Sequence, residues 1–304
     1  MDLRQLFALV AIADHGSFSA AARSLHTVQS NVSTHVARLE RELDTVLVDR
    51  STGALTEEGE AVVARARRVQ GELDALVADV TAVNQEVSGT VRAGVIGTTG
   101  RWLVPLLLEA LAARHPGIRL VVVDATTTSL LPQVAQSDLE LAVVALPVTD
   151  PDVATEPLFR EDRVLVAPPD HPLASIEPVT LADLGRYPLL LEPVGTSFRD
   201  ELDGFCAAAG VTLIPQAEVD GMRLLASLAH EGYGPAVLPF TAVASWRDGD
   251  WTLAGVDGLT PRSVGLARRR RGLLSAPARA VREVLREVIA AEAEHQPGVE
   301  MTLV

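Results

Sequence analysis

A polar stretch near the N-terminus carries side chains that can read DNA bases. Apolar residues recur at steps of 4, 3 and 4 in Val32, Val36, Leu39 and Leu43, which predicts a helix over 29–43 with one buried stripe. The opposite face holds Gln29, Ser30, Asn31, Ser33, Thr34, His35 and Arg38. Glutamine can pair with adenine, and serine can hydrogen-bond to several base edges of the major groove. The chemistry predicted for this face is sequence-specific DNA binding.

Two earlier helices have to position that polar face. Apolar residues at helical spacing predict a first helix over 2–14, and Gly16 supplies the positive φ that often ends a helix. Ser17 or Ser19 can cap a second helix, and only residues 26–28 separate it from the third. Two helices joined by such a tight turn are typical of a helix-turn-helix, whose second helix enters the major groove.

A short hairpin is predicted after the third helix, over 46–56, with Arg50 and Thr52 at its tip. A wing of this kind can contact the phosphates or the minor groove. The first 60 residues hold five arginines and nine acidic residues, so their net charge is −4 and the usual basic footprint is missing. Spacing alone therefore also allows a three-helix domain with a solvated polar face.

The order of motifs in the first 60 residues resembles that of LysR-type transcriptional regulators. The matching segments are Met1-Asp2-Leu3-Arg4-Gln5-Leu6, Gly16-Ser17-Phe18-Ser19-Ala20-Ala21-Ala22, Leu25-His26, Gln29-Ser30-Asn31-Val32-Ser33, Leu39-Glu40, Leu43, Asp49-Arg50 and Leu55-Thr56-Glu57-Glu58-Gly59. The resemblance implies a winged helix-turn-helix over 1–58, a dimerising linker helix over 59–88 and an effector-binding domain over 89–298. Thr27-Val28 departs from the family's apolar-then-hydroxyl pair, which puts the usual cap of the third helix in question. Thr34-His35 replaces a frequent Arg-Gln pair, and Asp44 replaces a glycine.

A heptad pattern continues from the hairpin without proline. Its apolar positions are Val62, Ala66, Val69, Leu73, Leu76, Val80, Val83 and Val87, at alternating steps of 4 and 3. Strict spacing over this length favours a coiled coil between two chains over a helix lying on its own domain. We therefore expect a homodimer, and the family resemblance implies a homotetramer. Two recognition helices would then read a two-fold symmetric site in promoter DNA.

The rest of the chain alternates strands and helices. Strands are expected at 90–96, 118–124, 139–146, 163–167, 188–191, 214–219, 235–238 and 263–267. This order predicts an α/β domain with one or two mostly parallel sheets, and proline-rich breaks near 147–157 and 168–178 suggest a crossover between two lobes. Segments 169–174 and 231–239 resemble the family's effector domain, which is similar to two-lobed periplasmic binding proteins. By that resemblance, lobe one is 90–162 plus 265–298 and lobe two is 163–264.

Hydroxyl-rich segments follow three of the predicted strands. The candidate effector-binding residues are Thr98, Thr99, Arg101, Thr128, Ser129, Thr196, Ser197, Arg199 and Tyr233. Ligands of open α/β sheets bind at the carboxyl ends of strands, where helix N-termini attract anions. We therefore expect a small anionic effector, a carboxylate, held by Arg101 or Arg199; helix capping by serine and threonine is the alternative for each cluster. Convergence of the clusters on one cleft is implied by the family resemblance, and Trp102 and Tyr233 are either apolar walls or core.

Composition narrows the functional classes. The chain has 304 residues, a net charge of −14 with arginine as its only basic residue apart from histidine, and one cysteine, Cys206, which excludes an intramolecular disulfide and fits a cytoplasmic protein. No apolar run approaches the roughly 18 residues of a membrane span. We find no catalytic motif and no metal-ligand spacing, so neither an enzyme nor a cofactor is expected. A secreted solute-binding protein would explain the second half and the apolar stretch after Arg4, but not the heptads; an α/β enzyme would explain only the sheet.

Overall fold

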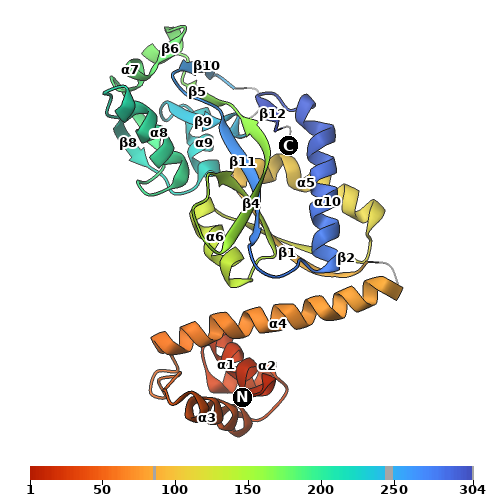
Figure 1. The fold of residues 1–304 in the computed structure, drawn as a ribbon. Helices are drawn as coiled ribbons and strands as arrows, with labels where there is room; N and C mark the ends of the chain where they lie inside the picture. Colours follow the sequence, from red (N-terminus) through yellow and green to blue (C-terminus); the bar gives the residue numbers. More distant parts are fainter. Residues whose placement is uncertain (85–86, 244–248, 303–304) are drawn as a thin grey trace. The chain divides into compact units, whose positions relative to one another are not determined.

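The computed structural model describes residues 1–84, 87–243 and 249–302. The chain divides into two compact units, the first formed mainly by residues 1–80 and the second by most of the remainder, and each is described by itself. Figure 1 shows the order of the elements along the chain. Within the described residues, no helix is long and apolar enough to cross a membrane.

Three short helices and one long helix form the first unit. They are α1 (Leu3–His15), α2 (Phe18–Ser24), α3 (Gln29–Leu43) and α4 (Glu57–Asn84). The predicted boundaries are confirmed, because Gly16 ends α1 with a φ of 71° and the Ser17 side chain accepts a hydrogen bond from Ala20 N to cap α2. Val28 precedes α3 without any side-chain cap, and Asp44 ends α3 in the left-handed region with a φ of 51°. Both departures from the family pattern therefore have the expected local effect.

The wing after α3 is held by few backbone contacts. Val48 and Leu55 form an isolated antiparallel bridge, and Thr56 N donates to Leu47 O at 3.0 Å. Leu47 and Val48 are fully buried with the apolar faces of α1 and α3. The predicted hairpin is thus a tight loop anchored at its base.

Helix α4 has an apolar stripe that the single chain leaves uncovered. At its start, Val63 and Ala66 are buried against the first unit. Further along, Val69, Leu73, Leu76, Val77 and Val80 are exposed. Of the predicted heptad positions, the side chain of Val83 lies outside the described part of the chain. An apolar stripe of this length is a surface for another protein.

A six-stranded sheet organises the first lobe of the second unit. Its strands are β1 (Gly89–Val95), β2 (Ile118–Asp124), β3 (Leu141–Leu146), β4 (Val153–Glu161), β11 (Arg262–Arg269) and β12 (Val299–Met301), in the order β12-β4-β11-β3-β1-β2. β1 pairs in parallel with β2 and β3, whereas β11 pairs antiparallel with β3 and β4, and β12 pairs antiparallel with β4. The expectation of a mostly parallel sheet was wrong, because strands that leave for the second lobe and return from it run in opposite directions.

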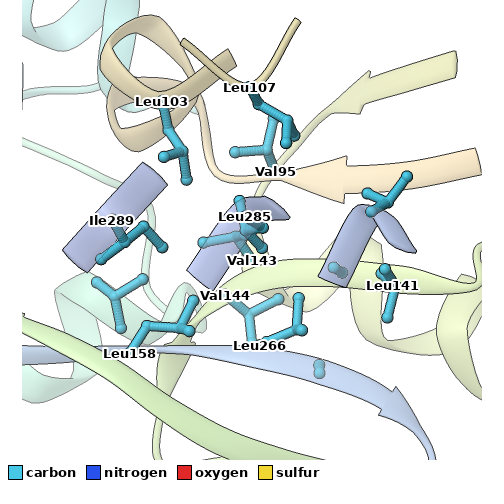
Figure 2. Packing of buried hydrophobic residues seen from close by; sticks show 14 of the residues in the cluster. Val95, Leu103, Leu107, Leu141, Val143, Val144, Leu158, Leu266, Leu285 and Ile289 are labelled. Atoms are coloured by element: carbon cyan, nitrogen blue, oxygen red, sulfur yellow. The ribbon is translucent and has the colours of Figure 1, made fainter. Parts of the chain in front are cut away.

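Helices cover both faces of this sheet. α5 (Gly97–Arg114) and α10 (Ala276–Glu292) pack on one face, where Figure 2 shows Leu103 and Leu107 of α5 opposite Leu285 of α10. α6 (Thr127–Gln136) covers the other face, and Gly94 leaves the space that the Leu130 side chain occupies, since a Cβ there would lie 2.7 Å from it. The core of the first lobe lies between these two layers.

The second lobe contains a four-stranded sheet and a separate parallel strand pair. The four strands are β5 (Arg163–Ala167), β6 (Val179–Thr180), β9 (Ala236–Pro239) and β10 (Thr252–Asp257), in the order β6-β10-β5-β9. The parallel pair is β7 (Pro188–Leu191) with β8 (Ile214–Glu218). Its helices are α7 (Leu181–Leu184), α8 (Ser197–Ala208) and α9 (Met222–His230), with short 3-10 turns η1 (Pro172–Ser175) and η2 (Phe240–Ala242); a third turn, η3 (Ala293–His295), follows α10.

Two crossings join the lobes. The chain passes from β4 to β5 through Asp162 alone, and it returns from β10 to β11 at Arg262. The first crossing lies after the proline-rich segment 147–157, whose end is already part of β4. The return lies three residues before the predicted boundary at 265. Strands β4, β6, β10 and β12 were not predicted from the sequence.

Candidate functional site

The polar face of α3 is exposed over its whole length. Gln29, Ser30, Asn31, Thr34 and Arg38 are exposed, and Ser33 and His35 are half-buried. Three of these side chains have neighbours that orient them. Ser19 Oγ of α2 donates to Gln29 Oε1 at 2.8 Å, Asn31 Nδ2 donates to Thr27 Oγ1 at 2.9 Å, and Thr34 Oγ1 donates to Ser30 O at 2.7 Å. The N-terminal end of α3 is therefore a surface of ordered hydrogen-bonding groups.

Arg50 of the wing lies against α3 instead of extending from the tip. Its guanidinium donates to Ser33 Oγ at 3.3 Å and to Glu40 Oε2 at 2.9 Å, and it stacks 5.9 Å from the Phe18 ring centre. Glu40 also accepts from the backbone of the wing's first strand, which fixes the wing to the helix. Thr52 is exposed at the tip, where its hydroxyl accepts from Ala54 N.

The predicted effector residues of lobe one divide into a buried pair and an exposed pair. Thr98 and Thr99 lie in the first turn of α5 and are 2% and 0% exposed. Thr98 Oγ1 accepts from Arg262 Nη2 at 3.3 Å, whereas Thr99 Oγ1 has no hydrogen-bond partner. Thr128 and Ser129 are exposed at the start of α6, and Thr126 caps that helix through Ser129 N. Trp102 packs edge-on against Phe159, which makes it part of the core.

The predicted effector residues of lobe two cluster at the start of α8. Thr196 and Ser197 are half-buried, and Thr196 Oγ1 donates to Pro193 O at 3.0 Å without capping the helix. Arg199 is buried, and its guanidinium donates to Asp203, Glu218 and Glu192 O, each at 2.8 Å. Tyr233 is 62% exposed.

A buried ion pair that the sequence analysis missed lies where the lobes meet. Arg262 Nε and Nη2 each lie 2.7 Å from Glu161 Oε2, and Glu161 Oε1 accepts from Thr241 N at 2.6 Å. Glu161 ends β4, Arg262 begins β11, and both are at most 5% exposed. Since Thr98 accepts from the same guanidinium, this pair connects α5 of lobe one with η2 of lobe two.

Aromatic stacking extends that cluster into α8. The guanidinium groups of Arg163 and Arg262 lie 5.6 Å and 5.8 Å from the Phe198 ring centre. Glu192, at the end of β7, is also buried, and burial raises the pKa of its carboxyl although the charge of Arg262 opposes the rise. The available sequence signal was a charged residue directly beside an apolar strand, which does not by itself reveal a partner 100 residues away.

A second charged group missed by the sequence analysis involves Arg223. Its Nη2 lies 2.5 Å from Asp124 Oδ2, which joins the first turn of α9 to the end of β2. Burial and the positive charge of Arg223 lower the pKa of Arg101. Arg101 and Arg223 are therefore neighbours, and the structure brings one predicted arginine together with one that was not predicted.

Neither a metal centre nor an activated thiol is evident in the described residues. Over 1–84, 87–243 and 249–302, no group of three or more His, Cys, Asp or Glu side chains is arranged to hold a metal ion. Cys206 is 1% exposed in α8, and burial raises the pKa of its thiol to about 11. A thiol in such surroundings is inert packing, as the sequence predicted.

Comparison with known families decides the class of the protein. Residues 3–60 match the bacterial regulatory helix-turn-helix protein, lysR family, and residues 84–290 match the LysR substrate binding domain. The chain belongs to the LysR family of transcriptional regulators. As a LysR-type regulator it binds promoter DNA through the helix-turn-helix and carries an effector-binding domain, as the sequence predicted. The alternative of a secreted solute-binding protein has no support, because the helix-turn-helix match covers the whole first unit up to α4.

Relatives of this LysR-type regulator span nearly its full length. The "Probable hydrogen peroxide-inducible genes activator" of Mycobacterium leprae is 35% identical over 298 residues, 94% of this chain and 94% of that protein. The DNA-binding transcriptional dual regulator OxyR of Escherichia coli strain K12 is 32% identical over 295 residues, 96% and 95% of the two chains. These relatives are themselves transcriptional regulators.

Solved structures have the same fold. A full-length OxyR variant from Pseudomonas aeruginosa superposes with a TM-score of 0.76 at 28% identity, over 95% of this chain and 94% of that one. Full-length CbnR complexed with its target DNA gives a TM-score of 0.67 at 24% identity, over 96% of this chain and 100% of that one. The second likeness concerns the fold alone.

Proposed function

We propose that this regulator recognises an interrupted palindrome through Gln29, Ser30 and Ser33 of α3. The observation that carries the proposal is the two-sided nature of α3, whose apolar face is buried while its N-terminal polar face is exposed and locally oriented. Asn31, Thr34, His35 and Arg38 extend the same face. Arg50 and Thr52 of the wing lie beside it and supply contacts to the DNA backbone.

The acidic charge of the first unit is compatible with DNA binding because much of it is paired. Glu40 is bonded to Arg50, Glu42 to the N-terminal ammonium of Met1, and Asp14 to Arg67 at 2.6 Å. None of these three acids belongs to the polar face of α3. With few arginines available for phosphates, binding should be modest and salt-sensitive.

The oligomer follows from the exposed stripe of α4. We infer a homodimer sealed by Leu73, Leu76 and their neighbours, and a homotetramer built from two such dimers. In a dimer, two copies of α3 address two half-sites about one helical turn apart. The coiled coil then relays a change in the effector domains to the spacing of the reading helices.

The effector is proposed to be a small carboxylate that binds at the strand ends of the second unit. The proposed residues are Thr98, Thr99, Arg101, Thr128, Ser129, Thr196, Ser197, Arg199 and Tyr233. Support comes from the buried, unpartnered Thr99 hydroxyl and from the arginine pair of Arg101 and Arg223. Arg199 acts by positioning the start of α8, because its donors are occupied by Asp203, Glu218 and Glu192.

Oxidation of Cys206 is not the proposed signal, although the names of the relatives refer to hydrogen peroxide. Peroxide attacks the thiolate, and a thiol with a pKa near 11 is ionised in roughly one molecule in ten thousand at pH 7. No second cysteine is present in the chain to form a disulfide. We infer a cytoplasmic regulator, without enzymatic activity, that responds to a bound molecule.

The DNA-reading proposal is tested with a duplex selected from random sequences by the full-length protein. Gln29→Ala should weaken binding to that duplex by about 1–3 kcal/mol and relax one base position, with little change on a scrambled duplex. Thr52→Ala is the matched control, because a lost backbone contact should weaken both duplexes equally. An equal loss for Gln29→Ala on both duplexes would show that Gln29 is only structural.

A further inference from the structure

One ion pair joins the two lobes at the surface. Asp124 ends β2 in lobe one, Arg223 lies in the first turn of α9 in lobe two, and 2.5 Å separate Asp124 Oδ2 from Arg223 Nη2. The side chain of Arg223 is 59% exposed and that of Asp124 is 32% exposed. Unlike Glu161 and Arg262, this pair is therefore open to exchange with solutes.

The backbone of α5 leaves the space that the pair occupies. A Cβ atom at Gly97 would lie 2.9 Å from Asp124 Oδ1 and 3.2 Å from both Cγ and Nε of Arg223. The absence of a side chain at Gly97 thus lets both charged groups approach the first turn of α5. Thr98 and Thr99, two of the proposed effector residues, follow directly in that turn.

Two cations share the one carboxylate. The charge of Arg223 lowers the pKa of Arg101, one turn along α5 from Gly97, so the two guanidinium groups repel each other. With Asp124 included, the three groups carry a net charge of +1. A second carboxylate would neutralise that charge, and arginine binds carboxylates through two parallel hydrogen bonds.

We propose that Asp124 is a built-in substitute for the effector's carboxylate, and that an anionic effector replaces it on Arg223 beside Arg101. The inference rests on the proposed function, which makes the effector an anion, and it adds Arg223 as a binding residue and Asp124 as its competitor. Exposed ion pairs contribute little to stability, so a ligand can displace Asp124 at low cost. Exchange releases the only printed surface ion pair between β2 and α9, which gives the ligand different affinities for the joined and separated lobes.

The test measures stabilisation of the full-length protein against thermal unfolding by sodium acetate, with sodium chloride at equal ionic strength as the reference. Asp124→Asn keeps the size of the side chain and removes its charge, so acetate should bind about fivefold more tightly than to the wild type, equivalent to about 1 kcal/mol. Arg223→Gln should lose the acetate effect, and the double variant should not regain it. Glu287→Gln is the matched control, because it breaks the exposed pair of Glu287 with Arg114 elsewhere in the same unit.

Each outcome separates the inference from the proposal beneath it. If acetate stabilises the wild type but Asp124→Asn binds it no more tightly, the competitor role is wrong and the anionic effector stands. An equal gain in Glu287→Gln would reduce the effect to overall charge and would also overturn the inference. If acetate stabilises neither the wild type nor Asp124→Asn, both the competitor role and the anionic effector are wrong, while DNA recognition by α3 is untouched.

Discussion

The DNA-reading face of α3 and the junction between the two lobes are built in opposite ways. The reading face comes from one helix of 15 residues, its polar groups are exposed, and its hydrogen bonds reach only to the adjacent helix and loop. The junction joins Thr98, Glu161 and Arg262, which are far apart in sequence, and its charges are buried. The first surface can exchange side chains without unfolding, whereas the second cannot lose a charge without leaving its partner unpaired.

The largest effect is expected at the junction. Arg262→Met leaves Glu161 as an uncompensated buried charge, and losing one partner of such a pair typically costs about 3–5 kcal/mol. Urea unfolding of the full-length protein, followed by a signal from the second unit, would measure the loss.

The double variant Glu161→Gln with Arg262→Met is the control for that result. Removing both charges should recover a large part of the lost stability, because no buried charge remains. A loss below about 1 kcal/mol in Arg262→Met would mean that the junction is hydrated and that the contrast with α3 is weaker than described.

The next largest effect concerns assembly. Leu73→Asp combined with Leu76→Asp places charges on the exposed apolar stripe of α4 and should separate the subunits, because unpaired charges are not tolerated in a helix seam. Sedimentation velocity would show the monomer. Val46→Asp, at an exposed apolar residue outside the stripe, should leave the oligomer intact; an unchanged oligomer in the double variant would end the coiled-coil assignment.

Two glycines test local packing with opposite signs. Gly97→Ala inserts a Cβ between Asp124 and Arg223 and should destabilise the protein by about 1–3 kcal/mol, whereas Gly71→Ala, which meets nothing within 4 Å on α4, should stabilise it by about 0.5–1 kcal/mol. Thermal unfolding of both variants measures the difference. The same sign for both would show that the space at Gly97 is not occupied as described.

The smallest effect is expected at the start of α3. Val28 has the extended backbone of a helix cap but no side chain able to accept a hydrogen bond, so Val28→Thr should stabilise the first unit by about 1 kcal/mol. Thermal unfolding would record the gain. A neutral result would indicate that water or Thr27 already satisfies the first turn of the helix.

The sequence predicted the first unit better than the second for a physical reason. The limits of α3 were predicted without error because its apolar spacing, its short preceding turn and Asp44 are all local signals. Helix α5 begins at Gly97, five residues before the predicted start, because Gly97 and Gly100 resemble a loop. In the structure, Gly100 lacks a Cβ because Val95 packs against it.

Long-range pairing limited the prediction of strands and of the site. β4 contains Pro157 opposite an irregular register at Gly265, so its sequence does not alternate like a strand. Hydroxyl clusters were recognisable as helix starts, but the pairing of Glu161 with Arg262 and of Asp124 with Arg223 depends on folding. Isolated charged residues beside strands do not identify their partners.

The most direct test of the account is the ratio of affinities for the selected duplex and a scrambled duplex, measured by fluorescence anisotropy at fixed salt for the wild type, Gln29→Ala and Asp124→Asn. The ratio should fall about 5- to 150-fold in Gln29→Ala, corresponding to about 1–3 kcal/mol, because a base contact is lost. In the absence of any carboxylate it should stay unchanged in Asp124→Asn, since Asp124 lies in the other unit. An unchanged ratio in Gln29→Ala, together with an altered ratio in Asp124→Asn, would contradict the assignment of DNA reading to α3.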